Sequence, residues 1–382
     1  MSTGTLLTAG RWENYVLRGR SEFCPFWRQL VDAKPRDILF VLGRGFDPRM
    51  CRGVRAILEL GGEGIRDCVA LEFDEGDGSP SRAHDDLRED NCQQLESLFS
   101  SRGTLVEKEI DMWSDDGRRR VGSIRAAGLF TSAEEISKYS DVVVDISALP
   151  RTLYIPLVAK LLYLVDKLGE ESSAPNLHVV VSDDPGLDQR IVSGGLDDEA
   201  SYIHGFESGV ELEATEGVPK VWMPILGEGK TGHFERIFDL VVPDEIAPAL
   251  PFPCANPRRA DDLILEYRAY LFDRLRVEPG NLMHVPEQNP FGVYRQLTAA
   301  IRHYSDALAL LGGCKVVLST LSSKLLSVGA VLAAYEFKQS GLSVGIAHVQ
   351  AGGYAIRPVE ASTPSEENLF EVWLTGECYD TA

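Results

Sequence analysis

The feature that most constrains this chain is a buried strand that ends in a glycine turn and is followed by a helix. It occurs at Asp37–Arg49, where the apolar run from Ile38 to Leu42 is followed by Gly-Arg-Gly and then by a helical pattern up to Leu60. The same order recurs at Lys220–Phe234, with Leu-Gly-Glu-Gly after the apolar run. Such a unit aims the free N–H groups of the helix at the turn, where anions bind.

Other strand and helix signals recur in the same order in both halves. The strongest strand, Asp141–Ser147, leads into an apolar helix over 152–168, and Lys315–Ser319 leads into a helix over 325–337. Near-continuous Val and Ile runs followed by helices are typical of parallel strands covered on both faces. We therefore predict an α/β fold of two tandem, diverged Rossmann-like units with parallel sheets. The alternative is that two unrelated α/β segments share this pattern.

Turn and loop signals along the chain predict four segments. These are a short helical N-terminal arm at 1–35, a first Rossmann-like unit at 36–190, an acidic, glycine-rich linker at 191–218 and a second unit at 219–382. The arm carries aromatic residues among charges, which favours packing on the first unit. The alternative is that the arm docks a protein partner. Its aromatic residues are Trp12, Tyr15, Phe23, Phe26 and Trp27.

Charge and cysteine usage exclude several classes of function. The 382 residues include 58 acids and 38 bases, for a net charge of −20, which argues against nucleic-acid and membrane-surface partners. Seven scattered cysteines without Cys-x-x-Cys spacing indicate neither a disulfide framework nor a zinc site, and the dispersed histidines add no metal signal. We find no signal peptide and no apolar run of roughly 18 to 20 residues, so we predict a cytoplasmic protein. The sequence identifies no cofactor.

The predicted site lies outside the carboxyl ends of the strands, where an open parallel sheet binds its ligands. Glycines there let backbone approach a ligand, and cations and hydroxyls hold anionic oxygens. Arg151 and Lys324 carry the strongest argument, because a cation in the first turn of a helix opposes the helix dipole unless an anion meets it. The predicted ligand-binding residues are Gly43, Arg44, Gly45, Arg49, Ser147 and Arg151 in the first half, and Gly227, Gly229, Lys230, Thr231, Ser319, Ser323 and Lys324 in the second.

The glycine turns depart from the known phosphate-binding motifs. Pro48 stands where the dinucleotide fingerprint has its third glycine, and Pro224 stands where a P-loop has its first, which argues against a P-loop NTPase. Simple chain reversal is the alternative for these turns. Ser147 and Ser319 have the alternative of capping the helices that follow them.

Aspartates at the strand ends are the candidate catalytic residues. Asp47, Asp183 and Asp184 follow the first and fifth strands of the first half and could serve as a general base or bind Mg²⁺. The alternative is that these carboxylates are solvated or cap helices.

The paired pattern of a strand, a serine-containing turn with a cation and an apolar helix resembles nucleotide-sensing Rossmann-like domains of prokaryotic cyclic-oligonucleotide effectors, over roughly 20 residues in each half. The resemblance implies ligand sensing and a fused or associated effector domain, which the sequence does not show. We expect a protein that binds an anionic small molecule, a nucleotide or phosphorylated metabolite, between the two halves. The alternatives are a hydrolase or a phosphoryl or nucleotidyl transferase, and a non-catalytic subunit of an assembly.

Overall fold

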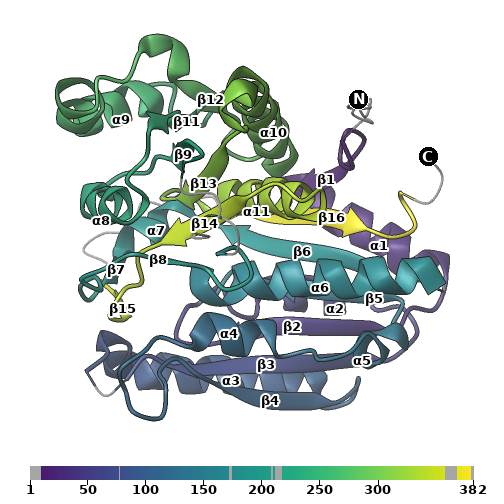
Figure 1. The fold of residues 1–382 in the computed structure, drawn as a ribbon. Coiled ribbons are helices and arrows are strands. Elements are labelled where there is room, and N and C mark those ends of the chain that lie inside the picture. The colour runs from purple at the N-terminus through teal and green to yellow at the C-terminus, as the bar shows by residue number, and fades with distance from the viewer. Residues whose placement is uncertain are drawn as a thin grey trace. The chain divides into compact units, whose positions relative to one another are not determined.

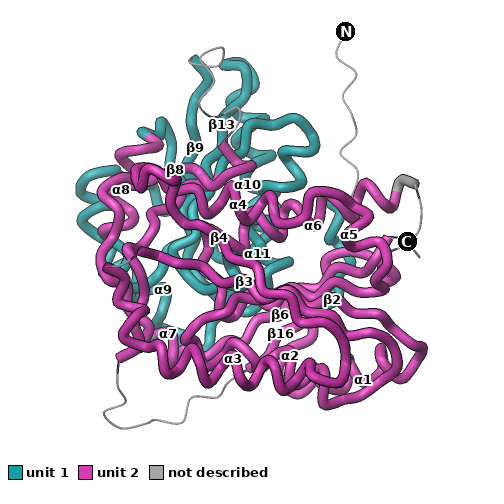
Figure 2. The backbone as a smooth tube through the Cα atoms, turned by 90° about the horizontal axis from the view of Figure 1, so that it is seen from below, with its two compact units in different colours: residues 1–16, 208–231, 242–345 teal, residues 17–207, 232–241, 346–382 magenta. Residues whose placement is uncertain are grey.

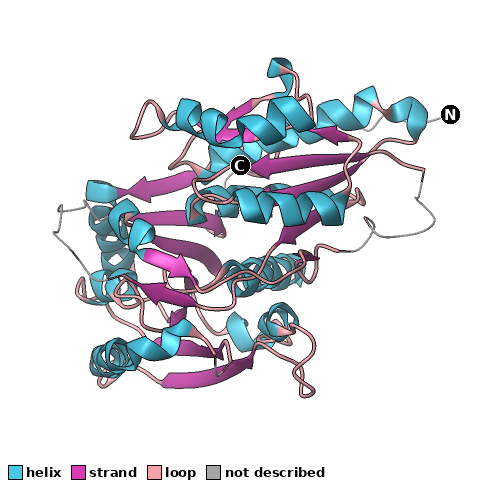
Figure 3. Cartoon of the chain, turned by 90° about the vertical axis from the view of Figure 1, so that its left-hand side faces the viewer, coloured by secondary structure: helices cyan, strands magenta, loops and turns pink. Residues whose placement is uncertain are grey.

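The computed structural model describes residues 10–76, 78–171, 174–207, 210, 217–357 and 368–379. These residues form a mixed α/β fold with two mainly parallel sheets, so the predicted α/β class is confirmed (Figure 1). Figure 3 distinguishes the strands from the helices that flank them.

The strands are β1 (Val16–Gly19), β2 (Ile38–Arg44), β3 (Arg66–Asp74), β4 (Leu105–Asp111), β5 (Asp141–Asp145), β6 (Asn176–Asp183), β7 (Ile191–Ser193), β8 (Ser201–Tyr202), β9 (Lys220–Ile225), β10 (Glu245–Ile246), β11 (Ala249–Pro251), β12 (Met283–Val285), β13 (Lys315–Thr320), β14 (Val344–His348), β15 (Tyr354–Ile356) and β16 (Asn368–Thr375). The helices are α1 (Phe23–Ala33), α2 (Arg52–Leu58), α3 (Asp85–Phe99), α4 (Gly122–Ala127), α5 (Glu134–Ser137), α6 (Arg151–Glu171), α7 (Pro185–Arg190), α8 (Thr231–Val241), α9 (Arg259–Arg268), α10 (Pro290–Ala307) and α11 (Lys324–Gln339).

The chain divides into two compact units, each built from separate stretches of sequence (Figure 2). Unit 1 takes the described residues of 1–16, 208–231 and 242–345, and unit 2 those of 17–207, 232–241 and 346–382. The predicted first Rossmann-like unit, 36–190, lies in unit 2, and most of the predicted second one, 219–382, lies in unit 1. The predicted segments were contiguous, whereas the predicted arm at 1–35 is divided after Val16 and the stretch from Ile346 onward belongs to unit 2.

The sheet of unit 2 has the strand order β1-β16-β6-β5-β2-β3-β4. Strands β2 to β6 run parallel, and β16 is antiparallel to β6. Phe40 and Val143 lie in a core cluster with α1, α2 and α3. Because side chains alternate along a strand, Val41 and Val144 point to the opposite face, which α6 covers (Figure 1). Val143 and Val144 are fully buried, which confirms the prediction of a central strand.

The sheet of unit 1 is built on β9, which lies between β11 and β13. The order of the sheet is β12-β11-β9-β13-β14-β8, with β10 paired to β9 off this path. The strands β9, β11, β12, β13 and β14, numbered in that order along the chain, have the arrangement 3-2-1-4-5, which is also the arrangement of β4-β3-β2-β5-β6 in unit 2. Helices α10 and α11 pack closely here, since a Cβ on Gly329 would lie 2.4 Å from the carbonyl oxygen of Pro290.

The aromatic residues of the predicted arm are largely inside the protein. Trp12 is buried edge-on against Tyr294 in unit 1, at 5.2 Å between ring centroids. Phe23 and Trp27 belong to α1 and are buried in the core of unit 2. Burial is what aromatic residues at helical spacing predict. Of these three residues, only Phe23 and Trp27 pack on the predicted first Rossmann-like unit, because Trp12 packs on Tyr294 of the second half.

Three further properties follow from the described residues. None of their helices is long and apolar enough to cross a membrane. Their histidine, cysteine and acidic side chains form no cluster that could hold a metal ion. All seven cysteines are free thiols.

Candidate functional site

In unit 2 the strand order reverses between β2 and β5, so the loops after these two strands frame the expected ligand position. The loops touch at Gly43, where a Cβ would lie 2.7 Å from Cδ2 of Leu149. A side chain at this position would have to displace Leu149, so glycine favours the close approach of the two loops. Two residues later the backbone is open, because no described heavy atom lies within 4 Å of a Cβ placed on Gly45.

Arg44 does not point into this opening. Its Nη1 donates to Glu72 Oε2 at 2.6 Å and to Glu107 Oε2 at 3.2 Å, and its Nε donates to the sulfur of Cys92. These partners come from β3, β4 and α3. Arg44 therefore links neighbouring elements, and these partners fit a structural tie better than the predicted part in an anion cradle.

Asp47 and Arg49 form a buried ion pair. Nε and Nη2 of Arg49 donate to the two carboxylate oxygens of Asp47 at 3.0 and 2.8 Å, and Nη1 donates to Asp188 Oδ1 at 2.7 Å. Asp188 lies in α7, so Arg49 joins the loop after β2 to the helix after β6. This pairing fits a structural tie better than the predicted catalytic role of Asp47 and ligand role of Arg49.

The other predicted aspartates lie at the end of β6. Asp184 caps α7, since its Oδ1 accepts the N–H of Leu187 at 3.0 Å. Asp183 is half-buried and stands opposite Asn368 of β16. Capping, which the sequence left open as an alternative, accounts for Asp184.

Ser147 and Arg151 follow β5. Ser147 is fully buried, and its hydroxyl accepts the N–H of Ser182 at 2.8 Å, so it offers no surface to a ligand in this conformation. Arg151 is the first residue of α6, as predicted, and is half-buried. Burial raises the pKa of Tyr354, and the charge of nearby Arg151 opposes the rise.

Unit 1 has a related arrangement between β9 and β13. A Cβ on Gly227 would lie 2.1 Å from the carbonyl oxygen of Leu321, so the loops after these strands also meet at a glycine. Gly229 has a φ of +66°, and no described heavy atom lies within 4 Å of its Cβ position. Lys230 and Thr231 follow it, half-buried, at the start of α8.

Arg259 ties together three strand-end loops of unit 1. Its Nε and Nη2 donate to the two carboxylate oxygens of Glu228, its Nη2 also reaches the Ser322 hydroxyl at 3.2 Å, and its Nη1 donates to Glu287. The sequence did not single out Arg259, because its partners lie between 28 and 63 residues away.

The remaining predicted residues of unit 1 lie on β13 and α11. Ser319 is fully buried, and its hydroxyl accepts the indole N–H of Trp222 at 2.9 Å, so it presents no surface to a ligand. Ser323 is the N-cap of α11, accepting the N–H of Leu326. Lys324 is the first residue of α11 and is half-buried.

A cluster at the strand ends of unit 2 was missed. Glu75 follows β3, is buried, and accepts a hydrogen bond from the Ser79 hydroxyl at 2.8 Å. Burial raises the pKa of the Glu75 carboxyl, although Ser79 and Ser81 oppose the rise. A buried acid with a raised pKa in a cluster of other polar groups is typical of functional sites. Its position after a strand was the available sequence signal, but the acidic loop suggested solvation.

The small sheet of β7 and β15 lies against this cluster. A Cβ on Gly353 would come within 2.2 Å of the Ser79 hydroxyl, and the N–H of Ile356 donates to Nε2 of His84 at 3.1 Å. Arg120 adds a second tie, because it pairs with both oxygens of Asp197 and stacks on Trp113 at 3.8 Å. The sequence gave Arg120 no role.

Comparison with known proteins adds little. No family model matches the chain, and no curated protein matches it. Among solved structures, the chain is similar to a functionally unknown protein, PA1789, from Pseudomonas aeruginosa PAO1, with 10% identity over 84% of this chain and 93% of that chain and a TM-score of 0.21. At this TM-score the similarity does not indicate a function.

Proposed function

We propose that this protein binds a nucleotide or another phosphorylated metabolite at the carboxyl ends of its parallel strands and acts as a ligand-sensing module. We further propose that the two sheets descend from one duplicated Rossmann-like unit. The shared 3-2-1-4-5 strand order supports this, as does the glycine at which the first and fourth strand-end loops meet, Gly43 in unit 2 and Gly227 in unit 1.

One observation carries the binding proposal. At each point where the strand order reverses, an open glycine lies after the first strand, and a cation begins the helix that follows the fourth strand. The pairs are Gly45 with Arg151 and Gly229 with Lys324. Open backbone admits a phosphate, and a cation at a helix N-terminus is favourable when an anion is present.

Thermal-shift screening of nucleotides, cyclic nucleotides and sugar phosphates tests the proposal. A ligand at 100 times its dissociation constant stabilises the protein by about 2.7 kcal/mol. Arg151→Gln and Lys324→Gln each remove a charge-assisted contact, so we expect ligand affinity to fall roughly 10- to 150-fold. Without ligand, stability holds or rises by about 0.3 to 1 kcal/mol, because a dipole clash is relieved.

Lys160→Gln is the matched control, since Lys160 lies on α6 beyond its first turn, over the ring of Tyr163. Its ligand affinity should match that of the wild type. If Arg151→Gln and Lys324→Gln lower the melting temperature of the free protein and leave the ligand-induced shift unchanged, the two cations are structural and the site assignment is wrong.

We propose as a second candidate that unit 2 carries out an acid–base reaction on its ligand, with Glu75 transferring the proton. The raised pKa of this buried carboxyl favours Glu75 over the predicted aspartates Asp47 and Asp184, which are ion-paired and capping. Mass spectrometry of ligands incubated with the protein should then show a product that Glu75→Gln no longer forms. Equal product from wild type and variant rules out this role.

A further inference from the structure

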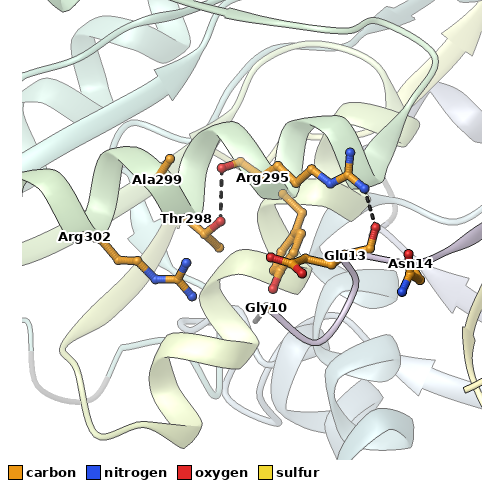
Figure 4. A pocket seen from close by; sticks show the side chains of 8 residues that line it. Gly10, Glu13, Asn14, Arg295, Thr298, Ala299 and Arg302 are labelled. Carbon is orange, nitrogen blue, oxygen red and sulfur yellow. Dashed lines mark hydrogen bonds between the residues drawn. The ribbon is translucent and has the colours of Figure 1, made fainter. Parts of the chain in front are cut away.

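Unit 1 contains a cavity of about 440 Å³ that none of the strand-end loops lines. Its walls are α10 and the segment 10–14 (Figure 4). Pockets for small molecules generally have volumes of roughly 300 to 1,000 Å³, so this cavity has the size for a small metabolite.

One face of α10 supplies two cations and a hydroxyl to this cavity. Arg295, Thr298 and Arg302 lie three and four residues apart, which places them along one side of the helix, and the two arginine positions are separated by roughly 10 Å. Figure 4 shows Arg295 extending toward Glu13 of the segment 10–14, with Thr298 and Arg302 further along α10. Thr298 donates its hydroxyl to the carbonyl of Arg295 at 3.1 Å, so its oxygen can still accept a hydrogen bond.

The charges in these walls are only partly neutralised by the protein. Arg295 donates to the backbone carbonyl of Glu13 and lies over Tyr15, but it has no carboxylate partner among the described residues. Arg302 pairs with Glu336 at 3.2 Å through Nη2, while its Nε is buried without a hydrogen-bond partner in the described part of the chain.

The opposite wall carries groups of complementary chemistry. The carboxylate of Glu13 and the amide of Asn14 line the cavity, and neither side chain has a hydrogen bond or an ion pair with another described residue. The cavity therefore presents a cation and an anion on facing segments, both exposed and neither paired with an opposite charge among the described residues. A purely anionic or purely cationic ligand would pair with only one of them.

We propose that this cavity binds a small zwitterion of the amino-acid type. Its α-carboxylate pairs with Arg295, where a guanidinium holds a carboxylate through two parallel hydrogen bonds, and its α-ammonium pairs with Glu13. The ligand's side chain lies along α10 toward Thr298 and Arg302, where a hydroxyl and a guanidinium group meet an oxygen atom. The chemical class is thus an amino acid with an oxygen-bearing side chain.

Calorimetry and thermal shift with L-glutamate and L-glutamine test the proposal. Glutarate, which lacks the amino group, and 4-aminobutyrate, which lacks the α-carboxylate, are the matched probes. We expect at least one of the two amino acids to bind, with its affinity exceeding that of either probe roughly 10-fold or more. No binding by either amino acid, or equal binding by glutarate, overturns the proposal.

Variants of Arg295 and Glu13, whose side chains are exposed, locate the site. Arg295→Gln and Glu13→Gln should each weaken amino-acid binding roughly 10- to 150-fold. Arg268 is exposed on α9, and Arg268→Gln is the control that should not change amino-acid binding. Arg151→Gln and Lys324→Gln should also leave it unchanged, which separates this cavity from the strand ends. Binding that survives both Arg295→Gln and Glu13→Gln lies elsewhere and overturns the assignment.

Discussion

His178 is a fully buried histidine held between two carboxylates and two tryptophan rings. Its Nδ1 lies 2.7 Å from Glu371 Oε1, its Nε2 lies 3.2 Å from Asp141 Oδ1, and the rings of Trp27 and Trp373 are each 5.0 Å from the imidazole. Burial alone lowers the pKa of His178, but Glu371 and Asp141 outweigh it and raise the pKa to about 9. His178 is therefore charged at neutral pH, inside the core of unit 2.

The raised pKa of His178 predicts how the free energy of unfolding depends on pH. The stabilisation is complete below the ordinary pKa of 6.5 and is lost as pH rises through about 9. The loss is on the order of 3 kcal/mol. Urea titrations at pH 6.5 and 9 measure the difference.

Glu371→Gln is the informative variant for this prediction, because it removes the carboxylate that contributes most to raising the pKa of His178. We expect the variant to be less stable at pH 6.5 and to lose most of the pH dependence up to pH 9. An unchanged pH dependence in Glu371→Gln means that another group titrates.

Two glycines at the strand ends should respond in opposite ways to alanine. Gly227→Ala places a Cβ 2.1 Å from the carbonyl oxygen of Leu321, so backbone must move, and we expect a loss of about 1 to 3 kcal/mol. Gly45→Ala meets open space, so we expect it to be neutral or to stabilise by about 0.4 to 1 kcal/mol.

The measurement is chemical unfolding of both alanine variants, followed by ligand titration of Gly45→Ala. If backbone at Gly45 approaches the ligand, its affinity falls although stability does not. Retained affinity in Gly45→Ala places the ligand away from this turn.

The residues of the strand-end loops were predictable only in part. Glycine after an apolar run marks a turn, so Gly43 and Gly227 could be found from the sequence. The roles of Arg44 and Ser147 could not, because their partners Glu107 and Ser182 come from other strands. A side chain's direction depends on which strands become neighbours, and a local pattern does not contain that information.

At the scale of elements, β5 is the centre of the unit 2 sheet. Val144 is fully buried and pairs with Val41 of β2 and Val179 of β6. Val144→Ala should therefore lower the free energy of unfolding by about 1 to 3 kcal/mol through lost burial and a cavity. Val106→Ala on β4, where the side chain is 42% exposed, is the control and should change stability far less. Similar losses in both variants would contradict a central position for β5.

Strands and helices with strong local patterns were predicted well. The runs at 141–147 and 315–319 are β5 and β13, and the helices that follow them are α6 and α11. Strand β16 was not assigned. Its sequence alternates less clearly because buried Glu371 interrupts the apolar face, and this carboxylate is explained only by His178 and Trp27, 193 and 344 residues away.

At the scale of the whole molecule, the chain is less modular than its sequence order suggests. The strand orders of both sheets follow from consecutive βα segments, which local patterns reveal. The discontinuous units do not, because β16 reaches the unit 2 sheet from the far end of the chain and pairs antiparallel with β6.

This return of the chain predicts that the first 207 residues do not suffice for unit 2. Without 346–382, the edge of β6 loses its partner strand, and the core loses Glu371, which binds the indole of Trp27 and the imidazole of His178. His178 would then keep the carboxylate of Asp141 but lose that of Glu371 inside an apolar core.

A fragment of residues 17–207 should therefore show no cooperative thermal transition by circular dichroism. The same fragment joined to 346–382 through a flexible linker should regain one, and Trp373→Ala in the joined fragment should lower its midpoint, because Trp373 packs on His178. If 17–207 alone melts as cooperatively and at the same temperature as the joined fragment, the C-terminal strand is an addition to unit 2 rather than part of its folding core.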